Sequence, residues 1–321
     1  MILVLSYKGF EQCTDPVIDW LLHYKRDFLK LSINDIYNDK KVKFDIHNDK
    51  VYVNGVDIIE KVNCIYFRRF EAACPVKLKN CFPTDQAEYE VTNEMNALIN
   101  YFFHLLKDKH WLPNPQSSSI DKLSALSIAK SVGLSIPKST VVNNRKDLEN
   151  FLSLNRNVII KPINFCGYYI EKDFSYFGFT RSFKDEDLKQ VEQSRFAPTL
   201  FQEKVDKDFE IRTFYLEGKL YPSAIIVDEG YKNHDDIKTV FNTKQIHWLP
   251  YQFPKDIENK IIMFMDKCGL NTGSIDIIKN KNDDFVFIEV NPVGQFIAPS
   301  RRCNYYVERL IAKWLIENDK R

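Results

Sequence analysis

Residues 274–292 carry oxygen-bearing side chains at a spacing that suits metal binding. The runs Ser274-Ile-Asp-Ile-Ile-Lys and Phe285-Val-Phe-Ile-Glu-Val-Asn-Pro292 flank an Asn/Asp-rich turn, which predicts a β-hairpin. Because side chains alternate across a strand, Glu289 and Asn291 share one face. If the register sets Asp276 opposite Glu289, two carboxylates and an amide oxygen converge, a ligand set for Mg²⁺. The alternative is a solvated polar face, which the apolar surroundings of the hairpin disfavour.

Two lysines could bind an anion. Lys161 ends an apolar strand, where its ammonium needs an anion such as phosphate or must reach the surface. Lys122 lies in the first turn of an expected helix, where a cation opposes the helix dipole. The loop that starts at Asn164 could fold over phosphates, although it has a single glycine and is no Walker-type loop.

A second polar group follows near residue 200. Gln202-Glu-Lys-Val205 precedes Glu210, and Arg212 shares the strand face of Glu210. A carboxylate can accept both hydroxyls of a ribose, and an arginine can clamp a phosphoryl group. The alternative for Glu210 and Arg212 is a plain ion pair.

The elements that position these residues fall into three expected parts. Residues 1–112 alternate strands and helices, including a strand over 2–5, a strand at Cys64-Ile-Tyr-Phe and a long helix over 87–106, which indicates an α/β unit with a parallel sheet. Trp111-Leu-Pro-Asn-Pro-Gln-Ser-Ser-Ser is typical of a linker. Residues 113–199 contain a helix over 120–132 and a strand over 157–162. Residues 200–321 contain further strands, the hairpin and a terminal helix over 305–317.

The order and spacing of these residues resembles the ATP-grasp superfamily over residues 114–295. The resemblance implies an α/β and α+β fold, in which an N-terminal pre-ATP-grasp domain precedes central and C-terminal subdomains that clamp ATP. The resemblance also implies which part of the ATP, metal and substrate each residue would bind. The phosphates would be bound by Lys122 and Lys161, the adenine by the hinge Gln202, Glu203, Lys204 and Val205, the ribose by Glu210, Mg²⁺ by Asp276, Glu289 and Asn291, and the transferred phosphate or acyl group by Arg212.

A narrower resemblance is to graspetide synthetases, the microviridin-type peptide macrocyclases. Cys64-Ile-Tyr-Phe-Arg-Arg69 looks like their strand that ends in paired arginines, Phe209-Glu-Ile-Arg matches their Asp/Glu-x-Arg element, and residues 242–254 look like a segment of grasp-with-spasm maturases. Arg68 and Arg69 point to opposite faces if the strand continues through them, so one could pair with Glu71 or Glu94 while the other holds a substrate carboxylate. Lys238 stands where related ligases have an arginine and is the expected catalytic substitute. Ser274 likewise replaces an arginine, whose part Arg212 would take.

The resemblance implies a reaction in which a side-chain carboxylate of a precursor peptide is activated by ATP and joined to a Ser or Thr hydroxyl or a Lys amine. The leader of that peptide could dock on residues 173–188, a region that reads equally well as a strand pair with an exposed helix. One alternative is an ATP-grasp carboxylate–amine ligase that adds a free amino acid. Another is a non-enzymatic nucleotide-binding module, which has little need of the whole residue set. Lone histidines such as His234 and His247 are more often structural than proton carriers.

Composition limits the remaining classes. The formal net charge of +1 among 321 residues gives no overall field for nucleic acid, and no apolar run approaches the length of a membrane span. Seven scattered cysteines without metal-ligand spacing favour free thiols in a cytoplasmic protein. The N-terminal run Met1-Ile-Leu-Val-Leu-Ser is expected to be a buried strand rather than a signal peptide. A homodimer is compatible with the resemblance.

Overall fold

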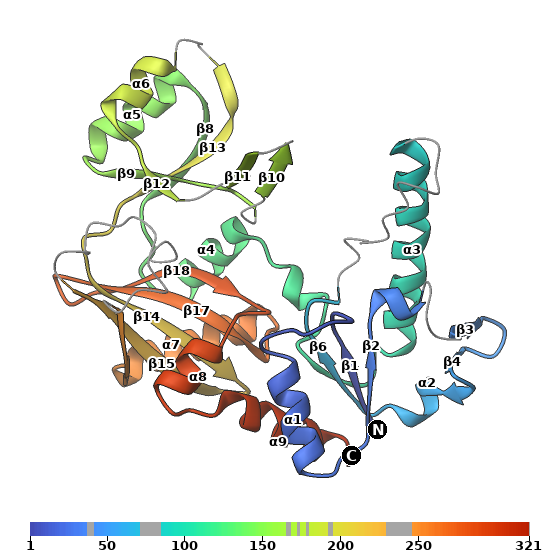
Figure 1. Ribbon diagram of the computed structural model, residues 1–321. Coiled ribbons are helices and arrows are strands. Elements are labelled where there is room, and N and C mark those ends of the chain that lie inside the picture. The colour runs from blue at the N-terminus through green and yellow to red at the C-terminus, as the bar shows by residue number, and fades with distance from the viewer. Residues whose placement is uncertain are drawn as a thin grey trace. The chain divides into compact units, whose positions relative to one another are not determined.

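The chain forms two compact units in the computed structural model (Figure 1). Unit 1 comprises Met1–Ser118 together with Gln295–Arg321, and unit 2 comprises Ser119–Gly294. The structure describes residues 1–36, 42–70, 85–164, 168–171, 174–177, 180–191, 195–228 and 246–320.

A four-stranded parallel sheet lies at the centre of unit 1. Its order is β2-β1-β6-β7, formed by β1 (Ile2–Leu5), β2 (Phe28–Leu31), β6 (Cys64–Phe67) and β7 (His110–Leu112). All four residues of β1 are fully buried, as the continuous apolar run of a central parallel strand requires. The expected parallel α/β unit is therefore confirmed. Trp111 and Leu112, expected in the linker, are instead buried residues of β7.

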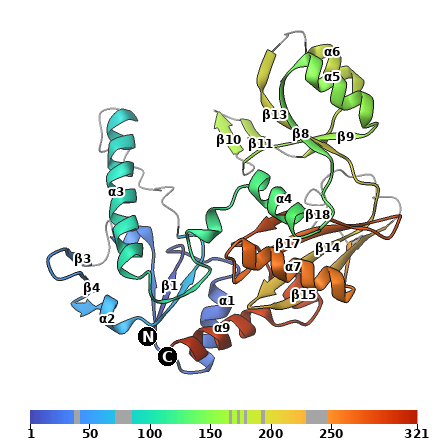
Figure 2. The same ribbon diagram turned by 180° about the vertical axis from the view of Figure 1, so that it is seen from behind.

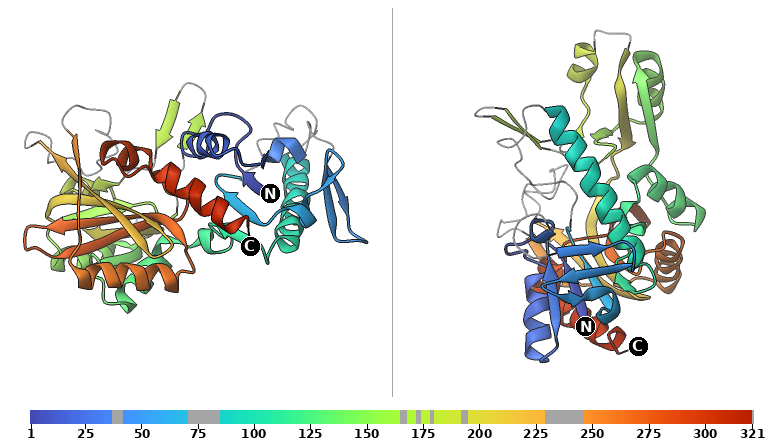
Figure 3. Two further views of the ribbon diagram at one scale, coloured as in Figure 1. Left: turned by 90° about the horizontal axis from the view of Figure 1, so that it is seen from below. Right: turned by 90° about the vertical axis from the view of Figure 1, so that its right-hand side faces the viewer.

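Five α-helices and a small antiparallel sheet also belong to the described part of unit 1. The helices are α1 (Asp15–His23), α2 (Ile58–Lys61), α3 (Asp85–Leu105), α8 (Ile297–Arg302) and α9 (Val307–Asn318), and the small sheet consists of β3 (Val42–Asp45), β4 (Lys50–Val53) and β5 (Val56–Asp57). Helix α9 lies beside α1, as Figure 3 shows from below. The Arg309 guanidinium stacks on the Trp20 ring at 5.3 Å, and its Nε donates to the Tyr24 hydroxyl.

Residues 295–321 thus belong to the same unit as residues 1–118, and not with residues 200–294 as the sequence suggested. The terminal helix itself is present, but its buried residues Val307, Ile311 and Leu315 pack within unit 1. Helix periodicity shows that a helix has an apolar side without showing which partner covers it. The expected boundaries near residues 112 and 199 remain predictions.

Unit 2 contains a four-stranded antiparallel sheet in the order β12-β9-β13-β8. Its strands are β8 (Ser139–Asn144), β9 (Val158–Lys161), β12 (Arg181–Ser182) and β13 (Arg195–Glu203). Leu148 of helix α5 (Arg145–Leu154) packs with Val158 and Phe201 in a small core, which Leu188 of α6 (Asp185–Gln190) borders. Strands β10 (Tyr168–Glu171) and β11 (Phe174–Phe177) pair separately.

A five-stranded antiparallel sheet in unit 2 has the order β16-β15-β14-β17-β18. It consists of β14 (Lys207–Leu216), β15 (Lys219–Val227), β16 (Ile246–Pro250), β17 (Thr272–Asn280) and β18 (Phe285–Asn291). Helices α4 (Lys122–Ser131) and α7 (Lys255–Lys267) share a core with this sheet (Figure 2). Phe264 of α7 meets Phe287 of β18 with ring centres 4.7 Å apart. The opposite face carries Glu210, Arg212 and Asp276 beside buried apolar residues such as Phe214 and Ile225.

Within the described residues, no helix is both long and apolar enough to cross a membrane.

Candidate functional site

The β17–β18 hairpin has the register on which the metal hypothesis depends. Asp276 lies opposite Glu289, and Ser274 lies opposite Asn291. Ile275 and Ile277 are buried on the face that α4 and α7 cover, so strand alternation places Asp276 on the other face. A bulge follows Asp276 in the ladder, a feature that re-aims side chains beside functional sites. The predicted hairpin and pairing are confirmed.

The three oxygen-bearing side chains converge. Asn291 Nδ2 lies 3.4 Å from Asp276 Oδ2 and 3.5 Å from Glu289 Oε1. Rotation of the amide by half a turn would present its oxygen instead, giving a set made entirely of oxygen donors. Such a set fits a hard cation such as Mg²⁺. Among the described residues, no cluster of three or more His, Cys, Asp or Glu side chains is arranged to hold a metal, so this set depends on the amide of Asn291 as its third member.

Arg212 brings a positive charge to this group. It lies opposite Asp276 in the β14–β17 ladder, and its Nη1 donates to the carboxylate oxygens Oδ1 and Oδ2 of Asp276 at 2.8 and 2.9 Å. Glu210, two residues earlier on the same face, makes a 2.9 Å salt bridge with Lys207. The two residues therefore share a face as predicted, and each forms a salt bridge with another residue, Glu210 with Lys207 and Arg212 with Asp276.

A tight turn beyond β18 limits where Asn291 can lie. A Cβ atom on Gly294 would come within 2.4 Å of Ser274 Cβ and 2.9 Å of the Asn291 carbonyl oxygen. Gly273, beside Ser274, is similarly close to the Asn291 carbonyl. Glycine at position 294 thus lets the chain pass directly over the end of the hairpin.

Lys122 contacts the segment that directly follows Lys161 at the end of β9. Helix α4 begins at Lys122, after Asp121 accepts the amide N–H groups of Leu123 and Ser124 as N-cap. Lys122 Nζ then reaches the carbonyl oxygens of Pro162 at 3.3 Å and Asn164 at 3.1 Å. Because Pro162 directly follows Lys161, the start of α4 lies beside the end of β9.

The segment 202–205 comprises the last two residues of β13 and the first two residues after it, and is fixed by hydrogen bonds. Gln202 is buried and donates to Ser139 Oγ at 2.9 Å. The Glu203 N–H donates to the Lys138 carbonyl, and the Lys204 N–H donates to the Asn157 carbonyl. Lys204 Nζ also contacts Ser182 Oγ at 3.3 Å. Val205 is half-buried where this segment leads into β14. The expected hinge thus has a defined backbone path.

The paired arginines lie in unit 1 and share a partner that the sequence did not reveal. Arg68 is buried, and its Nε donates to Glu11 Oε2 at 2.9 Å. Arg69 is 34% exposed, and its Nε lies 3.8 Å from Glu11 Oε1. Glu11 therefore replaces the expected partner Glu94, which is exposed, while Glu71 lies outside the described residues. The adjacency of β1 and β6 was the one signal that could have linked positions so far apart.

Several expected residues fall outside the described part of the chain. These are Lys238 and His234, the start of the segment 242–254, and parts of the expected leader surface 173–188. The rest of the segment 242–254 includes the edge strand β16. His247 on that strand lies 3.2 Å from Asp228, and both side chains are more than half exposed.

Solved structures of known proteins resemble this chain, whereas family models and curated sequences do not. A scan against protein-family models gave no match, and a search of curated proteins gave none. Solved structures are similar over almost the whole chain. The macrocyclase MdnC from Microcystis aeruginosa MRC, bound with the precursor peptide MdnA, has a TM-score of 0.83 and 22% identity, covering 98% of this chain and 99% of its own.

Two further structures are also similar over almost the whole chain. A RiPP-associated ATP-grasp ligase from Chryseobacterium gregarium, in complex with ADP and a leader and core peptide, has a TM-score of 0.83 and 21% identity, covering 98% of this chain and 96% of its own. The ATP-grasp ligase PsnB, complexed with a minimal precursor variant, Mg and ADP, has a TM-score of 0.81 and 16% identity, covering 99% and 98%. This chain therefore has the fold of the ATP-grasp ligases.

Proposed function

We propose that this protein is an ATP-dependent peptide macrocyclase, a graspetide synthetase that joins Asp or Glu side chains of a precursor peptide to Ser or Thr hydroxyls or Lys amines. The observation that carries the proposal is the group formed by Asp276, Glu289, Asn291 and Arg212 on one face of the large sheet. Full-length similarity to a macrocyclase bound with its precursor peptide, and to a RiPP-associated ATP-grasp ligase bound with a leader and core peptide, supports the choice of substrate.

The proposed nucleotide contacts all come from unit 2. Lys122 and Lys161 would bind the phosphates, and Glu210 would accept the ribose hydroxyls. The hinge Gln202, Glu203, Lys204 and Val205 would meet the adenine, largely through backbone groups. Asp276, Glu289 and Asn291 would hold Mg²⁺, which supplies charge neutralisation at the terminal phosphates when bound.

Two chemical steps would follow. A peptide carboxylate attacks the γ-phosphorus of ATP, the bond to the β-phosphate oxygen breaks, and an acyl phosphate and ADP result. The peptide hydroxyl or amine then attacks the acyl carbon, loses its proton and expels phosphate. Arg212 and Lys161 would neutralise the transferring group, and Lys238 is proposed to assist. Each linkage removes the elements of one water from the peptide.

The direct test mixes the enzyme, ATP, Mg²⁺ and the short peptide encoded beside it, if that peptide is rich in Thr, Ser or Lys and in Asp or Glu. We expect one water mass to be lost per linkage, with one ADP released for each. Addition of free glutamate to a protein, without mass loss from the peptide, would instead indicate a carboxylate–amine ligase.

Asp276→Asn tests the proposed site within this reaction. It removes one carboxylate of the metal group while keeping the side-chain size, so turnover should fall by about 10²-fold or more. Asp283→Asn, on the exposed hairpin turn, is the matched control and should keep full activity. Binding of Mn²⁺, followed by electron paramagnetic resonance, should weaken in Asp276→Asn alone. Unchanged turnover and Mn²⁺ affinity would contradict the metal assignment.

A leader and core peptide would be the partner, with the leader held away from the reacting groups so that remote binding energy positions the core. A homodimer and a cytoplasmic location remain predictions. Nucleic acid and membranes are not expected partners.

A further inference from the structure

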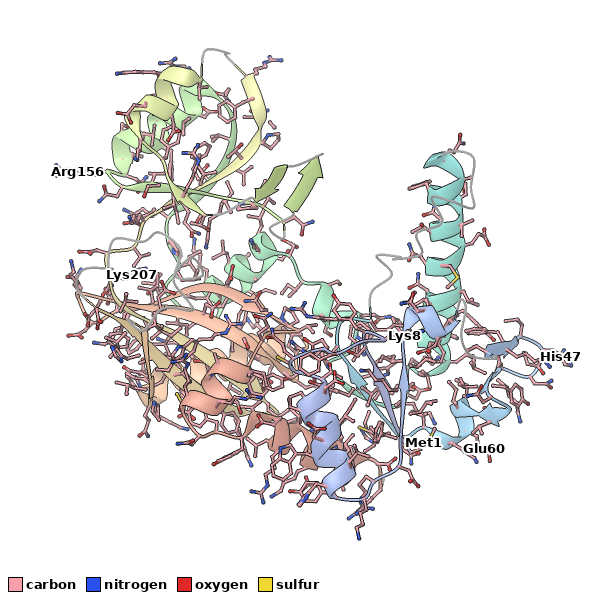
Figure 4. All side chains as sticks on the ribbon, in the orientation of Figure 1. Met1, Lys8, His47, Glu60, Arg156 and Lys207 are labelled. Carbon is pink, nitrogen blue, oxygen red and sulfur yellow. The ribbon has the colours of Figure 1, made fainter. Side chains whose placement is uncertain are left out.

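A row of side chains crosses the large sheet of unit 2 at one level and includes a residue to which the proposed site gives no role. Arg212 lies opposite Asp276 of β17 on one side, and opposite Ser223 of β15 on the other. Residues that lie directly opposite in a ladder project from the same face of the sheet. Ser223, Arg212 and Asp276 therefore follow one another along this face. Figure 4 labels Lys207 at the start of β14, the strand in the middle of the row.

The hydroxyl of Ser223 is buried without a hydrogen-bond partner. The side chain is 0% exposed, and among the described residues its Oγ neither donates nor accepts a hydrogen bond. Burial of such a group destabilises the folded protein, because the hydroxyl gives up its bonds to water without replacement. Most buried polar atoms in proteins are paired, so an exception of this kind points to a ligand or to a catalytic role.

The neighbours of Ser223 indicate which group its hydroxyl could bind. Pro250 of β16 lies opposite Ser223 on the side away from Arg212, and proline has no N–H to donate. Along β15, Tyr221 and Ile225 share the face of Ser223, and Ile225 is buried. Among these neighbours, Arg212 is the charged donor.

Arg212 and a divalent cation would compete for the same oxygens. Arg212 Nη1 donates to both carboxylate oxygens of Asp276, at 2.8 and 2.9 Å, and the two side chains are 14% and 22% exposed. A cation held by Asp276 and Glu289 would take up lone pairs of these oxygens and repel the guanidinium charge. The N–H groups that turn away from Asp276 then need another acceptor in a largely buried place.

The shape of the guanidinium suits such an exchange of acceptors. It carries several N–H groups in a rigid fork, and a hydroxyl oxygen accepts through its lone pairs. One N–H group bound to Ser223 would leave others directed at the transferred phosphate, which Arg212 is proposed to neutralise. Because a hydroxyl is neutral, Ser223 could replace Asp276 as the acceptor without reducing the positive charge that the phosphate meets.

We infer that Ser223 is a positioning residue, whose hydroxyl accepts an N–H group of Arg212 when Asp276 ligates the cation. The inference rests on the proposed function for the metal at Asp276. It deepens that function by linking metal binding to the orientation of Arg212, so that each should change the free energy of the other.

The test measures Mn²⁺ binding to the full-length protein by electron paramagnetic resonance. In Ser223→Ala, Arg212 lacks a replacement acceptor when it leaves Asp276, so Mn²⁺ should bind about ten-fold more weakly, as expected for one charge-assisted hydrogen bond. The unfolding temperature without Mn²⁺ should stay constant or rise, since a buried hydroxyl without a partner is removed. Ser223→Cys, which keeps a similar size but only a weak acceptor, should also weaken Mn²⁺ binding.

Thr213→Val is the matched control. Thr213 is also fully buried, and among the described residues its hydroxyl has no hydrogen-bond partner. It lies opposite Ile275, on the face that α4 and α7 cover. Its replacement should raise the unfolding temperature and leave Mn²⁺ affinity unchanged. Weakening of Mn²⁺ binding as large as in Ser223→Ala would count against a specific role for Ser223.

A second background shows whether Ser223 acts through Arg212. Arg212→Met removes the guanidinium that competes for Asp276, so Mn²⁺ should bind more tightly. Addition of Ser223→Ala to this variant should then change Mn²⁺ affinity no further. Unchanged Mn²⁺ affinity in Ser223→Ala alone would overturn the inference, as would an equal weakening in the Arg212→Met background.

Asp276→Asn is measured alongside these variants. If it weakens Mn²⁺ binding while Ser223→Ala does not, the positioning role fails and the proposed metal site stands. If even the wild type binds no Mn²⁺, the metal assignment fails and the inference fails with it.

Discussion

At the scale of single residues, the candidate site depends on contacts that differ in how readily sequence reveals them. Asp276, Glu289 and Asn291 could be predicted because strand alternation has a period of two and the turn fixes the register. Glu11 could not, because it lies 57 positions from Arg68 and meets it through the sheet order. The salt bridge of Arg212 with Asp276 depends in the same way on the pairing of β14 with β17.

Gly294→Ala tests the close approach at the end of the hairpin. The new Cβ would overlap Ser274 Cβ and the Asn291 carbonyl, so β17 and β18 must separate. We expect a loss of about 1–3 kcal/mol in the free energy of unfolding, as for other overpacked sites. Mn²⁺ affinity should also fall, because Asn291 is displaced.

Gly9→Ala is the matched control. A Cβ at position 9 meets nothing within 4 Å, so stability and Mn²⁺ affinity should remain unchanged. Urea unfolding followed by tryptophan fluorescence gives the first quantity. Equal effects of both substitutions would contradict the steric explanation.

At the scale of elements, helices and strands with strong periodicity were predictable, and their partners were not. The helix at the C-terminus and the strand at Cys64-Ile-Tyr-Phe occur as expected. Trp111 and Leu112 were misassigned because the following Pro and Ser residues dominate the local pattern, although both side chains are buried in β7. Burial in a short strand leaves little periodic signal.

The N-cap of α4 positions Lys122 and provides an element-scale prediction. Asp121→Ala removes the acceptor for two amide N–H groups and should cost about 0.5–2 kcal/mol of stability. The first turn of α4 would then fray, so ATP should bind more weakly in isothermal titration calorimetry. Asn144→Ala removes the N-cap of α5 and should cost a similar amount while ATP affinity is retained. Equal ATP affinity in the two variants would argue against a role for Lys122.

At the scale of the whole molecule, each unit has its own core. Phe102 and Phe264 are fully buried, the first in unit 1 and the second in unit 2. The composition predicted enough residues for separate cores, whereas assignment of residues 295–321 to unit 1 required the contacts themselves.

Differential scanning calorimetry should therefore resolve two transitions. Phe102→Ala and Phe264→Ala should each lower a different one, since such truncations cost about 3–5 kcal/mol. Mg–ATP at about 100 times its dissociation constant should add about 2.7 kcal/mol to the transition that Phe264→Ala lowers. A nucleotide effect on the other transition alone would contradict the assignment of the ATP site to unit 2.

The buried pair of Glu11 and Arg68 has a consequence for how this sequence can change over time. Loss of either charge alone leaves the other buried and uncompensated, whereas loss of both is tolerated. Substitutions at positions 11 and 68 should therefore occur together. A protein that has lost only one of the two charges should be less stable than one that keeps both or has lost both. Arg69 is partly exposed and lies farther from Glu11, so its replacement would leave no buried charge without a partner.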